Sequence, residues 1–261
     1  MLTFAPTKRL TDFLAAATNL GAEANLEELF HLFQLSTGES TLSKVMLVGQ
    51  TIDALGLCLK PDLTKGEIDT PRRILLRNLQ PLSCDIALSE IAKTETNDLE
   101  LKSSLMYHHK KAANAPHASL SDLKSDEVAH SCLKTVAAFL TSNGGLLYVG
   151  VDDTTQVVGL EFDFKLLGGK QGEDEWELHL RDLVKGTFKD GDNINDYLRV
   201  QFLKIDGKCV ARVEVGPRRR LSFLKWKGSY RLFRRQGNRT EEITIEQIKE
   251  FLVLRSSTIR Q

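Results

Sequence analysis

Long apolar runs are missing from this 261-residue sequence. No run approaches the roughly 20 apolar residues that a helix needs to cross a bilayer. Lys8, Arg9 and Asp12 stand where a secretory signal would be apolar. The content of 41% hydrophobic and 27% charged residues is that of a globular protein. We therefore expect a folded cytoplasmic protein with no membrane partner.

Paired cysteines and a phosphate-binding loop are missing as well. Cys58, Cys84, Cys132 and Cys209 occur singly, a spacing typical of neither a disulfide scaffold nor a zinc knuckle. The segment 168–170 (Gly-Gly-Lys) lacks the first glycine and the Ser or Thr of a P-loop. We expect no zinc and no nucleotide cofactor.

The chain also lacks net charge, with 35 basic and 35 acidic residues, and this balance alone points away from nucleic acid. The distribution is uneven, however. Residues 1–90 hold 8 basic and 11 acidic side chains, residues 91–203 hold 12 and 18, and residues 204–261 hold 15 and 6. A basic block of this kind is expected of a phosphate-binding surface, although a solvated β-ribbon explains it equally well.

Residues 1–90 are expected to form an all-α N-terminal module of unknown role. Apolar residues recur at helical spacing within 10–17, 26–33 and 45–59. Thr70 and Pro71 resemble an N-cap and first helical position, which predicts a further short helix to residue 79. We place the boundary between residues 80 and 90.

Residues 91–261 are expected to form one α+β domain with a mixed or antiparallel sheet. The predicted elements are a strand at 99–102, a loop at 110–125, a helix at 126–142, a strand at 146–151 with a partner at 157–160, a helix at 173–188, a hairpin within 198–215, strands near 221–224 and 230–234, and a helix at 245–254.

Three carboxylates flank the predicted strands and could meet. Glu95 precedes the strand at 99–102, Glu100 lies within it, and Asp153 follows the strand at 146–151. Carboxylate oxygens suit hard cations such as Mg²⁺, and Lys102 on the face of Glu100 could orient a water or stabilise developing phosphate charge. Spacing alone favours solvated or capping groups. His108, His109 and His117 lack metal-ligand spacing, and we expect them to be exposed.

The basic block contains aromatic residues, which could stack on bases while the cations neutralise phosphates. Trp226 and Tyr230 flank Gly228 in a predicted hairpin and are the better stacking candidates, whereas Phe223 and Phe233 are expected in the core. The candidate nucleic-acid-binding residues are Arg218, Arg219, Arg220, Lys225, Trp226, Lys227, Arg231, Arg234, Arg235 and Arg239.

The order of motifs resembles the Schlafen family in its AlbA-like core domain, over about residues 91–250. The motifs are Glu95 with 100–103 (Glu-Leu-Lys-Ser), 144–153 (Gly-Gly-Leu-Leu-Tyr-Val-Gly-Val-Asp-Asp), 158–160 (Val-Gly-Leu), 206–208 (Asp-Gly-Lys) and 234–240 (Arg-Arg-Gln-Gly-Asn-Arg-Thr).

This resemblance implies a nucleic-acid-binding domain and, in nuclease-competent members, a metal-dependent endoribonuclease acting on tRNA and rRNA. It places Glu95, Glu100 and Asp153 at the positions of a catalytic, metal-binding triad, with Mg²⁺ or Mn²⁺ as the ion and Lys102 assisting. Long Schlafen proteins carry two such lobes, so this single lobe predicts a homodimer.

Three functions remain open on the sequence alone. The first is the endoribonuclease, with tRNA-like RNA as partner. The second is a non-catalytic DNA- or RNA-binding regulator with the same fold, and the third is an adaptor that uses only its N-terminal module.

Overall fold

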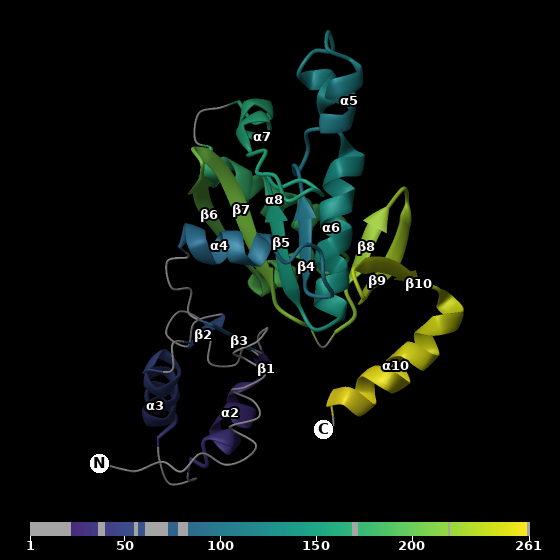
Figure 1. The fold of residues 1–261 in the computed structure, drawn as a ribbon. Coiled ribbons are helices and arrows are strands. Elements are labelled where there is room, and N and C mark those ends of the chain that lie inside the picture. Colours follow the sequence, from purple (N-terminus) through teal and green to yellow (C-terminus); the bar gives the residue numbers. More distant parts are fainter. Residues whose placement is uncertain are drawn as a thin grey trace.

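The computed structural model describes residues 22–35, 40–54, 57–60, 73–77, 83–168, 172–218 and 220–259. Its N-terminal part contains helices and a small sheet (Figure 1). The elements are β1 (Ala22–Ala24), α2 (Leu26–Leu32), α3 (Thr41–Ala54), β2 (Leu57–Lys60) and β3 (Arg73–Arg77). The strands are antiparallel in the order β1-β3-β2.

The expected helical part therefore precedes the core, but its description as all-α is wrong. Strand β3 occupies the segment predicted as a helix from residue 70 to residue 79. Its three central residues, 74–76 (Ile-Leu-Leu), form a short apolar run between Arg73 and Arg77, which fits either a strand or a helix. Helix α2 begins where Asn25 and Glu28 form a capping box. The helix expected at 10–17 lies outside the described residues.

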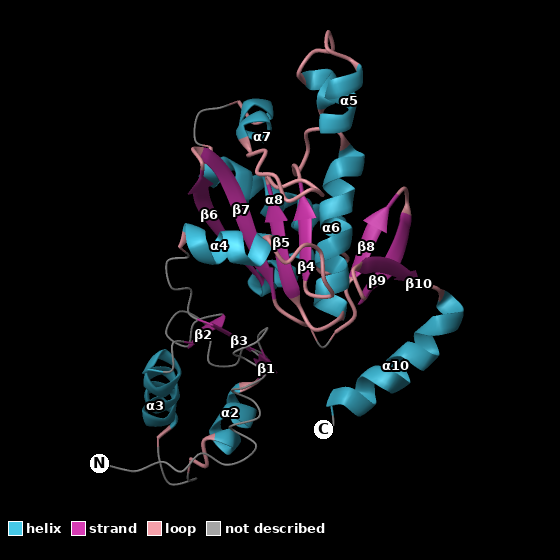
Figure 2. Cartoon of the chain, in the orientation of Figure 1, coloured by secondary structure: helices cyan, strands magenta, loops and turns pink. Residues whose placement is uncertain are grey.

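The core sheet has four strands in the order β4-β5-β7-β6. They are β4 (Leu99–Lys102), β5 (Gly145–Val149), β6 (Leu198–Ile205) and β7 (Lys208–Val215). β4 pairs with β5 in parallel, and the other pairs are antiparallel, so the sheet is mixed (Figure 2). The α+β class predicted from the sequence is confirmed.

Helices cover both faces of this sheet. On one face, α6 (Asp126–Thr141) and α8 (Glu173–Thr187) bury a large apolar cluster against the strands. Ser125 caps α6, with its hydroxyl accepting from the Val128 N–H at 3.4 Å. On the other face, α4 (Cys84–Ile91) packs Ala87 and Ile91 on the sheet. Helix α4 precedes residue 91, the expected start of the core domain, yet belongs to its packing.

A second, antiparallel sheet packs beside α6. Its strands are β8 (Phe223–Trp226), β9 (Ser229–Gln236) and β10 (Arg239–Ile243), and α10 (Ile245–Ile259) follows. Strand β10 was not predicted. The expected loop at 110–125 contains α5 (His109–Asn114) and a 3-10 turn at Ser121–Leu123, while the expected strand at 157–160 is reduced to a bridge between Val151 and Val157.

The remaining described elements are α7 (Glu161–Leu166), α9 (Gly191–Ile194) and a 3-10 turn at Asn195–Tyr197. None of the described helices is long and apolar enough to span a bilayer.

A buried carboxylate on α7 fixes the chain just after β4. Asp163 accepts from the Ser104 hydroxyl and from the backbone N–H groups of residues 105–107, at 2.8, 3.2 and 3.1 Å. The Trp176 indole of α8 donates to the same carboxylate at 3.2 Å. A charged acceptor that satisfies this many buried donors ties three elements together.

We expect Asp163→Asn to lower the free energy of unfolding by about 3 kcal/mol, because the amide nitrogen cannot accept and leaves buried donors unpaired. Urea unfolding followed by circular dichroism measures the change. Asp182→Asn, an exposed change on α8, is the control and should stay within about 0.5 kcal/mol. Equal stability of the two variants would contradict the prediction.

Candidate carboxylate site and basic surface

Glu100 and Lys102 share one face of β4, as the alternating sequence predicted. Lys102 Nζ donates to the Glu100 carboxylate and to the Leu101 carbonyl, the latter at 3.1 Å. The same ammonium lies 3.9 Å from a carboxylate oxygen of Glu95. Glu95 follows the turn that ends α4, where Thr94 takes a φ of 60°. The structure therefore gathers Glu95, Glu100 and Lys102.

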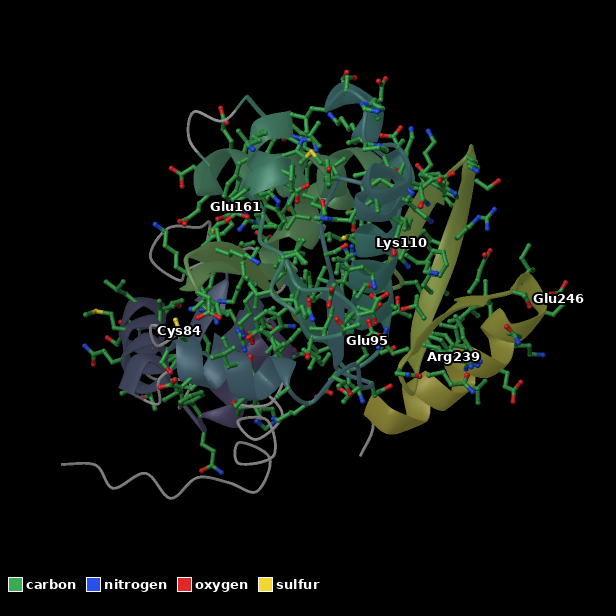
Figure 3. All side chains as sticks on the ribbon, turned by 45° about the horizontal axis from the view of Figure 1, so that its top comes forward. Cys84, Glu95, Lys110, Glu161, Arg239 and Glu246 are labelled. Carbon is green, nitrogen blue, oxygen red and sulfur yellow. The ribbon has the colours of Figure 1, made fainter. Side chains whose placement is uncertain are left out.

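Asp153 approaches the same edge of the sheet from β5. Because β4 and β5 are parallel, their carboxyl ends meet at one edge. Asp153 stands in the turn after β5, with its side chain 73% exposed and 3.9 Å from Lys110 Nζ of α5. Figure 3 labels both Glu95 and Lys110 among the side chains.

The neighbouring Asp152 forms hydrogen bonds within the turn. Its Oδ1 accepts from the Thr154 N–H and hydroxyl and from the Gln156 N–H at 2.9, 2.7 and 3.0 Å. Burial alone would raise the pKa of Asp152, but these hydrogen bonds lower it overall. Asp152 thus builds the turn that presents Asp153.

The pKa of Glu95 shows that the carboxylates act on one another. Burial raises this pKa, the charge of Glu100 raises it further, and Asp153 adds to the effect, while Lys102 only partly offsets it. Within the described part of the chain, however, no three His, Cys, Asp or Glu side chains are arranged to hold a metal ion. Asp153 therefore acts on Glu95 through its charge, and its carboxylate does not converge with those of Glu95 and Glu100.

Two predicted nucleic-acid contacts lie in the interior instead. The Arg235 side chain is 1% exposed and donates to Glu100 at 2.6 Å. The Arg218 side chain is 3% exposed and pairs with Asp190 of the loop before α9. Charge counts cannot distinguish an inward-facing arginine from an outward-facing one, so the sequence placed both on the surface. Arg219 lies outside the described residues.

The other predicted cations are distributed over both faces of the second sheet, its hairpin turn and the segment before it. Arg220, Lys225, Lys227 and Arg239 are exposed, and Arg231 and Arg234 are half-buried. Arg231 pairs with Glu242 at 3.0 Å, and Arg234 lies 3.6 Å from Glu241. Figure 3 labels Arg239 at the start of β10. We call these six residues the basic surface.

Helix α6 extends the basic surface with residues that the sequence did not single out. The His130 ring stacks on Trp226 with centroids 3.9 Å apart, and Lys134 lies over the Phe233 ring at 6.0 Å. Burial, followed by the charges of Lys134, Arg231 and Lys227, lowers the pKa of His130 to about 4. His130 is therefore neutral at pH 7. Trp226 already has a stacking partner, whereas Tyr230 is 52% exposed.

His109 is a second residue whose place differs from the expectation. It is half-buried, and its ring meets Tyr107 edge-on at 4.7 Å. Its Nε2 is buried and has no hydrogen-bond partner within the described structure. Burial lowers its pKa. The sequence placed His109 beside the predicted loop at 110–125, and no sequence signal marks this burial.

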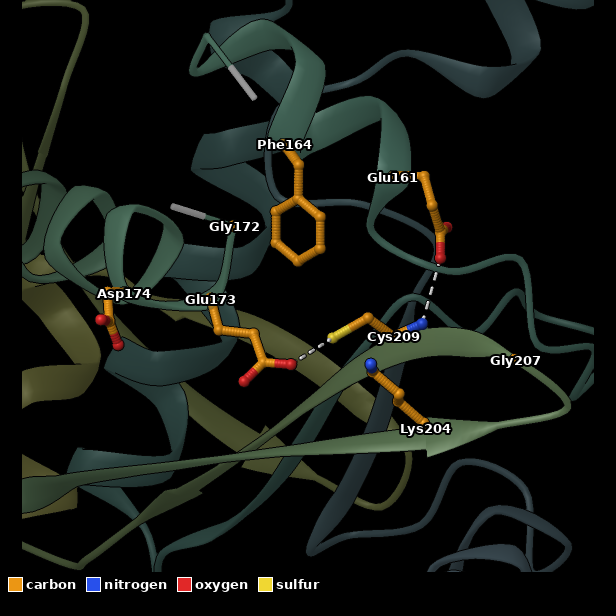
Figure 4. A pocket seen from close by; sticks show the side chains of 8 residues that line it. All are labelled: Glu161, Phe164, Gly172, Glu173, Asp174, Lys204, Gly207 and Cys209. Carbon is orange, nitrogen blue, oxygen red and sulfur yellow. Dashed lines mark hydrogen bonds between the residues drawn. The ribbon is translucent and has the colours of Figure 1, made fainter. Parts of the chain in front are cut away.

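A separate pocket of 470 Å³ is lined by none of the predicted site residues (Figure 4). Within it, Glu161 accepts from the Cys209 N–H at 3.1 Å and Glu173 accepts from the Cys209 thiol at 3.5 Å. Burial raises the pKa of this thiol to about 12, with Glu173 adding to the shift. The thiol stays protonated at pH 7 and is a poor nucleophile.

Comparison with known proteins gives one family. The family model described as Schlafen, AlbA_2 matches residues 95–244, which include every strand of both sheets in this region and all three carboxylates. No curated protein matches the chain. Among solved structures, the DIP2311 protein from Corynebacterium diphtheriae is 19% identical with a TM-score of 0.40, over 60% of this chain and 29% of that chain.

The raised pKa of Glu95 predicts a variant that is more stable than the natural chain. A raised carboxyl pKa means that the folded state loses stability as the pH rises above the ordinary value of 4.5. Glu95→Gln should therefore increase the free energy of unfolding at pH 7, by less than about 1 kcal/mol because the side chain is partly screened by solvent. The gain should vanish below pH 4.5.

Urea unfolding at pH 7 and at pH 4 measures this difference. Glu250→Gln, an exposed change on α10, is the matched control. A loss of stability in Glu95→Gln at pH 7 would contradict the prediction, because it would show that the ionised carboxylate is favoured.

Proposed function

Because the chain belongs to the Schlafen, AlbA_2 family, we propose that it is a metal-dependent endoribonuclease that cleaves structured RNA, with tRNA-like RNA as the first candidate and rRNA as the second. Family membership gives a nucleic-acid-related function. The cleavage reaction, the RNA substrate and the metal are our proposal.

One observation carries the proposal: the carboxylates of Glu95 and Glu100 meet at the Lys102 ammonium, which pairs with Glu100 and lies 3.9 Å from Glu95. Burial raises the pKa of Glu95, and the charges of Glu100 and Asp153 raise it further, as expected of carboxylates that repel one another. Mutual repulsion of this kind is relieved when a cation binds between the carboxylates. Carboxylate oxygens are the donors that Mg²⁺ and Mn²⁺ prefer, so the donor chemistry fits either ion. Glu95 and Glu100 would hold it, and Asp153 would add its negative charge from the neighbouring turn.

A bound divalent cation would supply Lewis-acid stabilisation of the phosphodiester oxygens. The chain's own residues do the rest. Lys102, held by Glu100, places a positive charge beside the carboxylates, where it can stabilise the developing charge on phosphorus-bound oxygen. The basic surface binds the RNA backbone, and Tyr230 offers an exposed ring for an unpaired base.

The second candidate is a nucleic-acid-binding regulator that does not cleave. It is favoured by the neutralisation of Glu100, which accepts from Lys102 on one oxygen and from Arg235 on the other. A carboxylate engaged in this way gives less to a metal than a free one. This candidate predicts binding by the same basic surface without cleavage.

Cleavage of tRNA by the purified full chain, with Mn²⁺ or Mg²⁺ and with chelator, tests the first candidate. We expect Glu100→Gln and Asp153→Asn each to reduce the rate by about 100-fold or more, since each removes a charge from the cation site. Glu250→Gln is the control and should cleave normally. Undiminished cleavage by either site variant or in chelator would refute the metal mechanism.

Binding to the basic surface has its own test, which separates it from cleavage. We expect the double change Lys225→Ala and Lys227→Ala to weaken RNA binding and to reduce the salt dependence of log K by about 1 per lost phosphate contact. Fluorescence anisotropy over a salt series measures both. Lys185→Ala on α8, also exposed, should change neither, and an equal effect of this control would argue against a local surface.

We further propose a cytoplasmic homodimer, because one lobe alone gives half of the RNA cleft that two lobes form in long Schlafen proteins. Sedimentation equilibrium should then give about twice the 29.2 kDa mass of one chain. A chain that sediments as a monomer and still cleaves RNA would contradict the homodimer.

A further inference from the structure

Two adjacent arginines on β9 point in opposite directions. Arg234 is half-exposed on the basic surface, 3.6 Å from Glu241. Arg235 turns inward, and its side chain is 1% exposed. A strand sends neighbouring side chains to opposite faces, so one strand of the basic region supplies both an outer and an inner cation.

All three guanidinium nitrogens of Arg235 donate hydrogen bonds inside the protein. Nη1 donates to Glu100 Oε2 at 2.6 Å and to the Thr240 hydroxyl at 3.0 Å. Nη2 donates to the Thr96 carbonyl at 2.5 Å, and Nε donates to the Asn97 carbonyl at 3.3 Å. The guanidinium also lies over the Phe139 ring of α6, 5.2 Å from its centroid.

The partners of Arg235 belong to both parts of the carboxylate site, the segment that carries Glu95 and the side chain of Glu100. The Thr96 and Asn97 carbonyls directly follow Glu95, while Glu100 lies on β4. One rigid group thus fixes the segment that carries Glu95 and the side chain of Glu100 at the same time. The loop's other hydrogen bonds include a local one from the Thr96 N–H to the Leu99 carbonyl at 3.0 Å and one from the Leu146 N–H of β5 to the Asp98 carbonyl at 2.7 Å.

We propose that Arg235 is a positioning residue of the carboxylate site, which holds Glu95 and Glu100 in one fixed arrangement and does not contact phosphate. This inference rests on the proposed function. It also links the two halves of that function, because the strand that bears the RNA-binding Arg234 and Arg231 bears the positioning Arg235.

Lysine cannot replace arginine in this role. Arginine presents five N–H donors in a planar fork, and Arg235 directs three of its nitrogens to four acceptors on different segments. A lysine ammonium keeps the positive charge beside Glu100, but its N–H donors all lie on one nitrogen and cannot reach acceptors on different segments. Arg235→Lys therefore separates charge neutralisation from positioning.

The test compares Arg235→Lys with Arg234→Lys in the full chain. For Arg235→Lys we expect a drop in kcat of about 10- to 100-fold with KM for RNA and RNA affinity within about 3-fold, since misplaced groups lose rate more than binding. Arg181→Lys on α8, outside the carboxylate site and the basic surface, is the activity control, and its kcat should stay within about 3-fold. Equal losses of RNA affinity in Arg235→Lys and Arg234→Lys would overturn the inference, because Arg235 would then act as a phosphate contact.

Two further measurements do not depend on cleavage. Hydrogen exchange of the backbone amides at residues 95–99 should speed up at least 10-fold in Arg235→Lys and remain unchanged in Arg234→Lys. Mn²⁺ binding followed by electron paramagnetic resonance should weaken in Arg235→Lys alone. Unchanged exchange in that segment would overturn the inference even if cleavage fell.

The same measurements separate this inference from the proposed function. If the natural chain cleaves no RNA, the nuclease proposal fails while the exchange result still decides whether Arg235 fixes the Glu95 segment. If Arg235→Lys unfolds, the double change Arg235→Met with Glu100→Gln removes both charges together, and faster exchange at 95–99 in this folded variant remains the expected result.

Discussion

A carboxylate enclosed between layers of a protein must be neutralised where it stands, and this constraint at Glu100 organises the candidate site. Glu100 is 8% exposed, and an unpaired charge at such depth costs several kcal/mol, about 3–5 when one partner of a buried pair is removed. Lys102 meets it from its own strand and Arg235 from the second sheet. The second sheet is therefore held against β4 by charge as well as by apolar packing on α6.

The zero net charge of the chain revealed neither the arginines that pair with carboxylates in the interior nor the basic surface. Five arginines of the basic block lie within ion-pair distance of a carboxylate, namely Arg212, Arg218, Arg231, Arg234 and Arg235. The excess of nine basic residues in the last segment thus overstates the charge that faces solvent. Positive charge remains around His130, whose pKa is lowered to about 4 by burial and then by Lys134, Arg231 and Lys227.

Periodicity and turn residues predicted the elements that have a regular local pattern. The strand β4, the helix α6 and the hairpin of β6 and β7 all appear where expected. Strand β9 shows why the rest could not be predicted, since it buries adjacent Leu232 and Phe233 and then Arg235. Which face of β9 meets α6 depends on contacts between segments far apart in the chain, and these have no local signature. The same reason hid the burial of His109.

The state of Glu95 separates a functional interpretation of the carboxylates from a purely structural one. A carboxylate kept for stability has its pKa lowered by its partners, as Glu90 has: burial alone would raise that pKa, but hydrogen bonds from Arg212 and Tyr148 lower it. The pKa of Glu95 is raised by burial, Glu100 and Asp153, so its ionised form costs stability. An amide at this position would fold better. Lys102, 3.9 Å away, offsets this cost only in part, and a bound cation or a cationic group of a ligand would offset more of it.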